Sequence, residues 1–240
     1  MKPYNIDKSK KTEVKQMFGA IAPTYDKLNH RLSLSIDKLW RRRVVNLLKD
    51  LPHEARVLDV ATGTADLAIL IAKKLNINVI GTDLTPEMLA IGKQKVEANN
   101  LGNLVQLQEA DSEKLPFDDN TFDAVTVAFG VRNYENLDRG LEEMGRVLRK
   151  GGRMVILEFS HPQSFPFKQL YMFYFKHILP TLGGRISHDK KAYEYLPASV
   201  IEFPCGTEFE AHLTAAGLKP TKRRELTFGV ATIYVAEKVS

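Results

Sequence analysis

The sequence contains one cysteine, Cys205, and six scattered histidines in 240 residues. A single cysteine excludes an intrachain disulfide and a zinc site built from cysteines, and without a His-Glu-x-x-His motif we expect no metal. No apolar run approaches about 18 residues, and the opening Met1-Lys2-Pro3-Tyr4-Asn5 forms no apolar signal segment. We therefore expect a cytoplasmic protein, either soluble or peripheral to a membrane.

The excess of positive charge is also small, with a formal net charge of +5 at pH 7. This charge is compatible with attraction to nucleic acid or to anionic lipid, but it requires neither. The basic run Lys8–Lys15 is equally ambiguous, because it can form a solvated helix face or contact lipid headgroups. With 44% hydrophobic residues, the chain can bury the core of one sizeable domain.

The most informative stretch is the strand-like run Val57-Leu58-Asp59-Val60, which continues into Ala61-Thr62-Gly63-Thr64-Ala65-Asp66. Apolar residues lead into an aspartate and a glycine-containing turn, and a helical pattern follows over 67–75. This pattern indicates a buried strand, a tight loop and a helix. In open α/β sheets such a loop lies at the carboxyl end of the strand, where ligands bind.

A second strand over 78–82 leads to Asp83, and a carboxylate at this place can accept hydrogen bonds from both hydroxyls of a ribose. The preceding loop has one central glycine and lacks the Gly-x-Gly-x-x-Gly pattern of a pyrophosphate binder. A nucleoside with a ribose but no diphosphate therefore fits best, and we expect S-adenosylmethionine. Its methionine portion should lie against the loop backbone near Gly63 and Thr64.

Strand and helix patterns alternate from about residue 55 to 160, which predicts a parallel sheet flanked by helices. The remaining strands of this sheet are expected at 104–107, 122–129 and 153–159. After a helix over 208–216, two strand-like runs at 218–226 and 228–236 should pair as an antiparallel hairpin. The predicted fold class is α/β: a Rossmann-like class I S-adenosylmethionine-dependent methyltransferase with a mostly parallel seven-stranded sheet and a C-terminal antiparallel hairpin.

We divide the chain into four segments: an N-terminal helical cap (1–50), a cofactor-binding α/β core (51–160), an aromatic-rich insertion (161–203), and a helix and hairpin that complete the core (204–240). The insertion holds nine aromatic residues: Phe165, Phe167, Tyr171, Phe173, Tyr174, Phe175, Tyr193, Tyr195 and Phe203. It follows the fifth strand and should therefore lie above the ligand end of the sheet, as a lid or substrate cover. An ordinary small core is the alternative.

Three aspartates, Asp59, Asp83 and Asp111, follow successive strands at the expected ligand edge. Carboxylates that cluster there would repel one another unless a ligand or hydrogen-bond donors satisfied them. We expect Asp111 and Ser112 to lie beside the adenine, with Asp111 accepting from its exocyclic amine. Asp59 is expected to orient the loop or the methionine ammonium.

Four stretches of the chain resemble one family, the ubiquinone/menaquinone biosynthesis C-methyltransferases. They are Tyr25-Asp26-Lys27-Leu28-Asn29-His30-Arg31-Leu32-Ser33-Leu34-Ser35-Ile36-Asp37-Lys38-Leu39-Trp40, the Thr64 loop, Phe129-Gly130-Val131-Arg132-Asn133, and the segment from Arg146 to Ser160 with its Lys150-Gly151-Gly152 turn. The Thr64 loop and the Gly-Gly turn indicate only a class I methyltransferase, whereas the first and third stretches are specific. Ala65 departs from a frequent second glycine of the family, and Ala128 from a serine of some members.

The resemblance, which runs from about residue 10 to the C-terminus, implies C-methylation of demethylmenaquinol to menaquinol with S-adenosylmethionine as cofactor. Methylation of the benzoquinol intermediate of ubiquinone biosynthesis is the alternative. The prenylated quinol is too apolar to diffuse freely, so we expect peripheral membrane contact through the aromatic insertion and Lys168, Lys176 and Arg185. The head group, the prenyl length and a homodimer stay open.

Arg132, Asn133 and Asp26 are the expected catalytic residues. Ring C-methylation needs electron density on carbon, which comes from ionising a quinol hydroxyl. A guanidinium beside that oxygen favours the phenolate, but Arg132 itself stays charged and accepts protons poorly. The base is therefore Asp26, a histidine or a water. The alternative for Arg132 is a solvated loop residue.

Two other classes of protein are disfavoured. A protein that binds or methylates nucleic acid should carry a concentrated basic stripe and an Asn/Asp-Pro-Pro-aromatic motif after the fourth strand, where Phe129-Gly130-Val131-Arg132 stands instead. A nicotinamide oxidoreductase should carry the third glycine of the dinucleotide-binding loop. We therefore expect no nucleic-acid partner.

Overall fold

The computed structural model describes residues 1–4, 6–173 and 190–239, and their strands form one sheet in the order β3-β2-β1-β4-β5-β7-β6. The strands are β1 (Arg56–Val60), β2 (Asn78–Asp83), β3 (Val105–Glu109), β4 (Phe122–Ala128), β5 (Leu148–Phe159), β6 (Leu218–Leu226) and β7 (Ala231–Lys238). The first five run parallel, and β7 pairs antiparallel with both β5 and β6. The predicted mostly parallel sheet with a C-terminal hairpin is confirmed.

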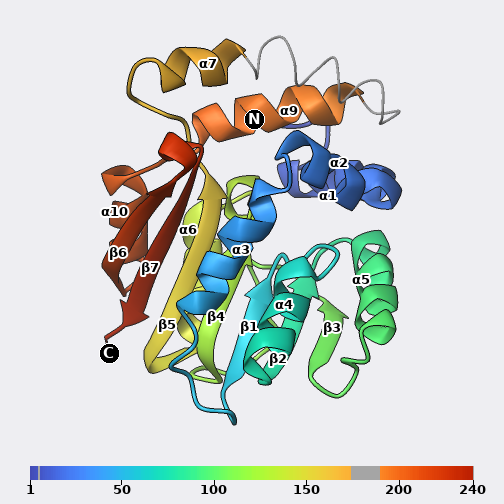
Figure 1. Cartoon of the computed structure of the whole chain (residues 1–240), viewed down its shortest axis with the longest axis vertical. Helices are drawn as coiled ribbons and strands as arrows, with labels where there is room; N and C mark the ends of the chain where they lie inside the picture. The colour runs from blue at the N-terminus through green and yellow to red at the C-terminus, as the bar shows by residue number, and fades with distance from the viewer. Residues whose placement is uncertain (5, 174–189, 240) are drawn as a thin grey trace.

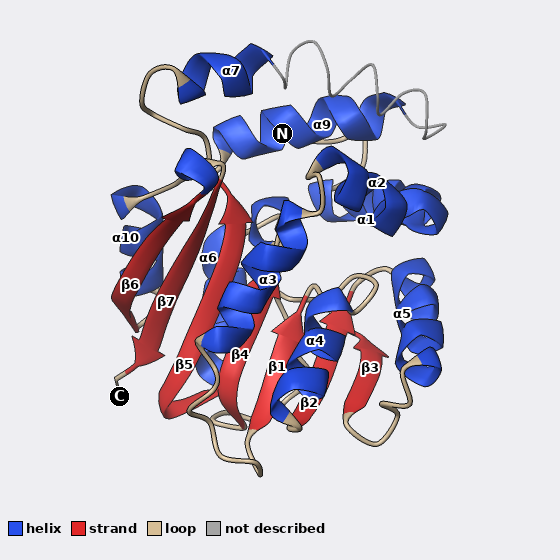
Figure 2. Cartoon of the chain, in the orientation of Figure 1, coloured by secondary structure: helices blue, strands red, loops and turns tan. Residues whose placement is uncertain are grey.

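Helices cover both faces of this sheet (Figures 1 and 2). The helices are α1 (Lys10–Ile21), α2 (Tyr25–Leu32), α3 (Ile36–Asn46), α4 (Asp66–Leu75), α5 (Pro86–Ala98), α6 (Leu137–Val147), α7 (Phe167–Phe173), α9 (Lys190–Glu202) and α10 (Thr207–Ala215), with short 3₁₀ turns η1 (Ala22–Thr24), η2 (Val131–Asn133) and η4 (Thr227–Gly229). Buried side chains of α3, α4 and α5 pack on one face, including Trp40 and Ile71. Those of α6 and α10, including Met144 and Phe209, pack on the other.

A third cluster lies above the carboxyl ends of the parallel strands, where α1, α2 and α9 cross the top of the sheet (Figure 1). It includes Met17 of α1, Leu28 of α2 and Tyr195 of α9. Of the expected cap at 1–50, α1 and α2 therefore lie over the sheet edge, whereas α3 packs on the sheet face and belongs to the main core. The pattern of 1–50 did not show this division, because amphipathic helices on the face and on the edge look alike in sequence.

The Lys150-Gly151-Gly152 turn noted in the sequence lies inside strand β5. Helix α6 ends at Val147, and β5 begins at once with Leu148, which pairs with Phe122 of β4. The register between these strands shifts after Phe122, and Gly151 adopts φ +72 within β5. The two glycines thus accommodate an irregular start of β5 and do not terminate the helix.

Asp59, at the end of β1, ties the Thr64 loop to the neighbouring strand. Its carboxylate, only 1% exposed, accepts hydrogen bonds from the hydroxyls of Thr62 and Thr126, both at 2.6 Å. Of the two roles expected for Asp59, this geometry supports orientation of the loop. Burial raises the pKa of Asp59 to about 6, although the two hydroxyl donors oppose the shift.

This raised pKa predicts how Asp59→Asn changes stability with pH. Between the ordinary pKa of 3.8 and the raised value, the folded chain binds more protons than the unfolded chain. The contribution of Asp59 to the free energy of unfolding is therefore full below pH 3.8 and is lost as the pH rises through about 6. Asparagine does not titrate. The free energy of unfolding of the variant minus that of wild type, measured with a denaturant, should therefore be about 1 kcal/mol larger at pH 8 than at pH 5. An equal difference at both pH values would contradict the assignment.

Candidate active site

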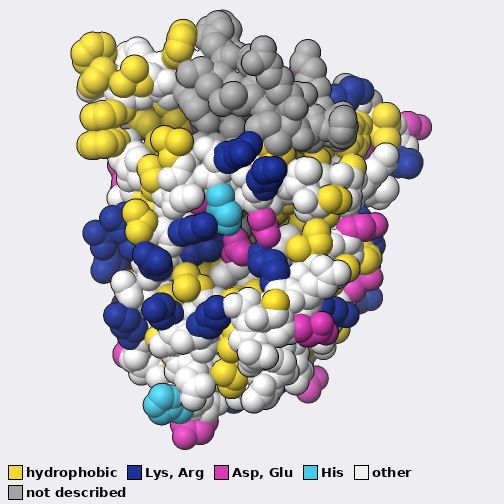
Figure 3. Space-filling view, turned by 45° about the vertical axis from the view of Figure 1, so that its right-hand side comes forward, with side chains coloured by type: hydrophobic (Ala, Val, Ile, Leu, Met, Phe, Trp, Pro, Cys, Tyr) yellow, Lys and Arg dark blue, Asp and Glu magenta, His cyan; other side chains and the backbone are white. Residues whose placement is uncertain are grey.

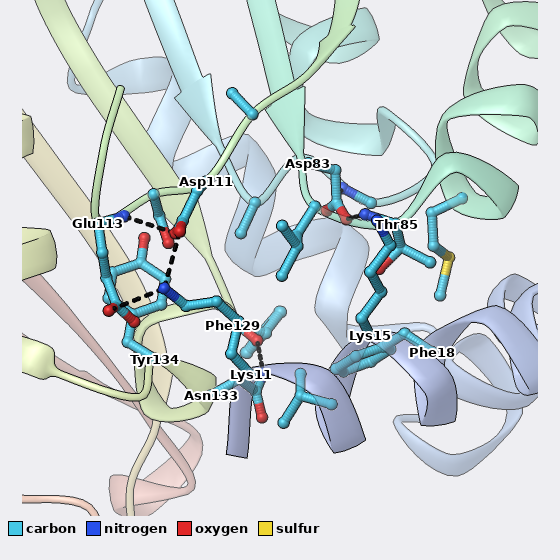
Figure 4. Close-up of a pocket in the computed structure, with 18 of the residues that line it drawn as sticks. Lys11, Lys15, Phe18, Asp83, Thr85, Asp111, Glu113, Phe129, Asn133 and Tyr134 are labelled. Carbon is cyan, nitrogen blue, oxygen red and sulfur yellow. Dashed lines mark hydrogen bonds and ion pairs between the residues drawn. The ribbon is translucent and has the colours of Figure 1, made fainter. Parts of the chain in front are cut away.

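A pocket lined by both charged and apolar side chains opens between α1 and the carboxyl ends of the parallel strands, with about 720 Å³ of open space. Five of the nine residues expected at the site line it: Gly63, Asp83, Asp111, Ser112 and Asn133. Figure 4 shows Asp83 on one side of the pocket and Asp111 on the other, with α1 below them. Because the carboxyl ends of parallel strands lie at one edge of the sheet, residues that are up to 70 positions apart in sequence come together here.

Asp83 presents a half-buried carboxylate to this pocket. The backbone N–H groups of Gly63 and Thr85 donate to its two oxygens at 2.8 and 2.9 Å. Burial raises the pKa of Asp83, and these N–H donors counteract the effect. Because Asp83 lines the pocket, its carboxylate can also accept from the hydroxyls of a ribose.

The loop next to Asp83 leaves room for a ligand. Gly63 has φ +59, and no atom of the described residues lies within 4 Å of the place where its Cβ would be. By contrast, a Cβ on Gly130 would meet the Ala61 side chain at 2.7 Å, so Gly130 lets two loops pack together. The open wall at Gly63 and the acceptor at Asp83 fit the ribose and methionine portions of S-adenosylmethionine.

Thr64 and Asp26 occupy a different place. Neither lines the pocket: the Thr64 hydroxyl donates to one oxygen of Asp26 at 2.6 Å, and Lys95 of α5 approaches the other oxygen at 2.8 Å. Asp26 therefore fastens α2 to the cofactor loop. The structure does not bring its carboxylate to Arg132, and we do not retain Asp26 as the base.

The lysines of α1 close the side of the pocket where Asp111 lies. Lys11 bridges Asp111 at 2.7 Å and Glu113 at 3.1 Å, and Lys15 pairs with Glu109 at 2.7 Å. Burial lowers the pKa of Lys11, but its bonds to the two acids outweigh burial and raise it overall. Neither interpretation of Lys8–Lys15, a solvated helix face or a lipid contact, describes these lysines. They hold α1 to the sheet edge.

A second, largely apolar pocket of about 960 Å³ adjoins the first. Its walls come from α1, α2, α3, α9 and the ends of β5 and β7, and include Trp40, Phe159 and Leu196. Phe18, Tyr25 and Phe129 line both pockets. Two molecules, one bound in each pocket, would therefore be neighbours at these three side chains.

Arg132 lines the apolar pocket as half of a buried ion pair. Its side chain is 6% exposed and donates to Glu158, which is fully buried at the end of β5, at 2.8 Å. The same nitrogen donates to the carbonyl of Phe129. The Nε–H of Arg132 is buried and has no hydrogen-bond partner in the described part of the chain. The alternative of a solvated loop arginine is wrong.

Phe129 holds an unusual conformation between the two pockets. Its φ of +63 is in the left-handed region, which bulky side chains rarely adopt. Its ring packs 4.4 Å from the ring of Phe159 and 6.0 Å from that of Trp40, and its carbonyl accepts from Arg132 and, at 3.4 Å, from Asn133. Strained residues that the surroundings hold in place cluster at functional sites.

The sequence analysis missed Glu158, Tyr195 and the bridging role of Phe129. Glu158 carried a usable signal, because it ends an apolar strand in the same way as the three aspartates. Tyr195 carried none beyond its place in the aromatic insertion, because its contacts depend on how α9 crosses the sheet. The pair Arg132–Glu158 spans 26 residues, and no local pattern indicates such a pairing.

Solved structures support the fold. The chain aligns with the [4+2]-cyclase SpnF at a TM-score of 0.71 and 17% identity, covering 95% of this chain and 96% of that one. It aligns with an S-adenosylmethionine-dependent methyltransferase from Aquifex aeolicus at a TM-score of 0.58 and 20% identity, covering 81% and 88%. At these identities the likeness concerns architecture alone.

Curated relatives are much closer in sequence. A demethylmenaquinone methyltransferase of Bacteroides fragilis is 46% identical over 239 residues, covering 99% of this chain and 97% of that protein. The ubiquinone/menaquinone biosynthesis C-methyltransferase UbiE of Geotalea daltonii is 47% identical over 228 residues, covering 94% and 96%. The model of the ubiE/COQ5 methyltransferase family matches residues 6–238. The resemblance noted in the sequence is confirmed, and the chain belongs to the ubiE/COQ5 methyltransferase family.

Proposed function

We propose that this protein transfers a methyl group from S-adenosylmethionine to a ring carbon of demethylmenaquinol. The observation that carries the proposal is the pair of adjoining pockets. One carries charged side chains, among them a strand-end carboxylate that can accept from a ribose, and the other is largely apolar with a buried arginine. The names of the relatives support a quinone head group as the acceptor. The benzoquinol of ubiquinone biosynthesis is the second candidate.

In this proposal each pocket holds one reactant. Asp83 accepts from the ribose, Asp111 and Ser112 flank the adenine, and the backbone at Gly63 faces the methionine portion. When bound, the cofactor supplies an electrophilic methyl group on a sulfonium. Phe18, Tyr25 and Phe129, the walls common to both pockets, exclude water and orient the acceptor ring, and such orientation can contribute about 7–11 kcal/mol.

Arg132 raises the electron density of that ring by stabilising the quinolate. A phenol with a pKa of about 10 is ionised to roughly one part in a thousand at pH 7, which costs about 4 kcal/mol. Glu158 neutralises much of the charge on Arg132, so we assign the stabilisation to the unpartnered Nε–H. A donor aimed at an oxygen that gains charge is worth more in a buried site than in water.

The head group is tested with purified protein, S-adenosylmethionine, and demethylmenaquinol and demethoxybenzoquinol analogues of equal prenyl length. We expect the naphthoquinol to be methylated with the larger kcat/KM, since the apolar pocket is bounded by the broad rings of Trp40, Phe129 and Phe159. Mass spectrometry of the products places the methyl group on carbon or oxygen. A preference for the benzoquinol would reverse the assignment, and O-methylation would refute C-transfer.

The role of Arg132 should be tested in a variant of the protein in which removal of Arg132 does not leave the buried Glu158 carboxylate without its partner. Removing one partner of a buried pair costs about 3–5 kcal/mol of stability, so Arg132→Ala is compared with its parent in a chain that already carries Glu158→Gln. We expect kcat to fall about 10²–10³-fold, as for the loss of one oxyanion donor. The deficit should shrink as the pH rises from 7 to 10, because solvent then ionises the quinol.

Arg132→Lys, which keeps the charge but not the planar donor set, should also lower kcat while the KM for S-adenosylmethionine stays near that of wild type. A merely structural arginine would lower the melting temperature and leave any rate deficit independent of pH. Parallel pH–rate profiles for Arg132→Ala and its parent would therefore remove Arg132 from the chemistry.

We further propose that the protein meets its prenylated substrate at the cytoplasmic face of a membrane, through an apolar patch on α7 and η4. Phe165, Leu170, Phe173 and Phe228 are 57–80% exposed, and Phe228 stacks on Phe167 of α7 with ring centroids 4.0 Å apart. Figure 3 shows exposed hydrophobic side chains at the upper left, above a group of lysines and arginines. No helix in the described ranges is long and apolar enough to cross a bilayer.

This patch adjoins the substrate pocket, because Val230 and Trp40 line the pocket and Trp40 donates to Thr227 beside Phe228 at 3.0 Å. Exposed Lys168 lies on α7, whereas Lys176 and Arg185, which we expected to contribute, lie outside the described residues. Apolar side chains beside basic ones favour an anionic surface.

Leu170→Ser combined with Phe228→Ser should weaken binding to vesicles of anionic phospholipid about thirtyfold or more, because each serine removes roughly 1 kcal/mol or more of apolar transfer energy. Co-sedimentation at low and high salt measures the effect, and wild-type binding should fall with salt. Val239→Ser is the matched control, since Val239 is 65% exposed but lies near the C-terminus, at the opposite end of the sheet (Figure 1). Equal loss in the control, or no wild-type binding at low salt, would contradict the proposal.

A further inference from the structure

The short turn η2 separates the two pockets, and its consecutive residues serve different ones. Arg132 lines the apolar pocket, whereas Asn133 lines the cofactor pocket. Tyr195 of α9 also lines the apolar pocket. A group that links Tyr195 to Asn133 therefore links the two sites directly.

Such a link is present. The Tyr195 hydroxyl donates to Oδ1 of Asn133 at 3.2 Å, and both residues are buried, at 3% and 9% exposure. The amide nitrogen of Asn133 donates to the carbonyl of Phe129 at 3.4 Å, the contact drawn as a dashed line beside Phe129 in Figure 4. With its oxygen accepting on one side and its nitrogen donating on the other, the amide has one orientation.

The hydroxyl is suited to this task. Burial raises the pKa of Tyr195 to about 12, although the charge of Arg132 opposes the shift, so the hydroxyl remains a donor at neutral pH. Without it, Oδ1 would lose a buried donor, and the amide could rotate until its oxygen faced the Phe129 carbonyl. Asn133 would then present a different face to the cofactor pocket.

We propose that Tyr195 is a positioning residue that acts through Asn133 and couples occupancy of the apolar pocket to affinity in the cofactor pocket. The proposal rests on the proposed function, because it takes a quinone head group as the ligand of the apolar pocket. A ligand packed against Ala192, Tyr195 and Leu196 holds α9 against η2 and so preserves the amide orientation. By linkage, each ligand then tightens the binding of the other by the same factor.

The test is calorimetric titration of the full chain with S-adenosylhomocysteine, with and without 2-methyl-1,4-naphthoquinone, which has the product head group and no prenyl chain. In wild type we expect the naphthoquinone to lower the Kd of S-adenosylhomocysteine about three- to tenfold, the range set by one buried neutral hydrogen bond. The measured quantity is the ratio of the Kd without naphthoquinone to the Kd with it. In Tyr195→Phe, which keeps the ring, the ratio should fall below about twofold. In an Asn133→Ala background, Tyr195→Phe should change nothing further.

Two controls separate this coupling from damage to the fold or to the cofactor site. Ser199→Ala removes a hydroxyl one turn along α9 that bonds only to Leu196 among the described residues, and it should keep the wild-type ratio. Asp83→Ala deletes the expected ribose acceptor and should weaken the binding of S-adenosylhomocysteine about 10- to 150-fold, both with and without the naphthoquinone.

The outcomes are distinguishable. An unchanged ratio in Tyr195→Phe, or a further effect of Tyr195→Phe in the Asn133→Ala background, overturns the positioning role while the proposed function stands. The same holds if both ligands bind wild type without influencing each other. If the naphthoquinone does not bind at all, the proposed function fails and the coupling falls with it. A purely structural Tyr195 would lower the melting temperature and leave the ratio of the two Kd values as in wild type.

Discussion

The arrangement of the site depends on the buried ion pair between Arg132 and Glu158. Two charges taken out of water are tolerated only when each has a partner, and breaking such a pair costs about 3–5 kcal/mol. Here the pair joins the end of β5 to η2, and the same guanidinium nitrogen also holds the carbonyl of Phe129. It thereby fixes a left-handed phenylalanine as the common wall of two pockets. The N–H of Phe129, which donates to Leu157 at 2.7 Å, and its ring, which packs on Phe159 and Trp40, help to hold the same conformation.

The three strand-end aspartates show why charge alone does not identify a ligand. Repulsion among them called for a ligand or hydrogen-bond donors, and the protein itself supplies donors to each. Asp59 accepts from threonine hydroxyls, Asp83 from backbone N–H groups, and Asp111 from Lys11. The features that call for ligands are the open space at Gly63 and the unpartnered Nε of Arg132. Both are absences of contact, and only the folded structure can show them.

The sequence predicted whatever depends on local periodicity and on the strand-end rule. The parallel strands and the C-terminal hairpin follow from local sequence patterns, and the meeting of Gly63, Asp83, Asp111 and Ser112 follows from parallel βαβ topology, which places successive loops at one edge. The contacts that the sequence did not predict are those between segments far apart in the chain. The basic run of α1 gave no sign that its lysines would meet acids about 100 residues away, and Asp26 stood in a specific motif yet serves Thr64 and Lys95. Motifs identify residues that matter, but packing decides which role each one takes.

In the proposed function, the two pockets divide recognition of the cofactor and of the acceptor between parts of the chain. The cofactor pocket is built mainly from strand ends and their loops, which are features of the architecture, and a [4+2]-cyclase shares that architecture at 17% identity. Fold therefore does not determine the acceptor. The acceptor pocket is built largely from α1, α2, α3, α9 and the aromatic stack of Trp40, Phe129 and Phe159. Differences in acceptor among proteins of this fold should thus be sought in the helices above the sheet and in the turn after β4, where Arg132 and Asn133 face opposite pockets.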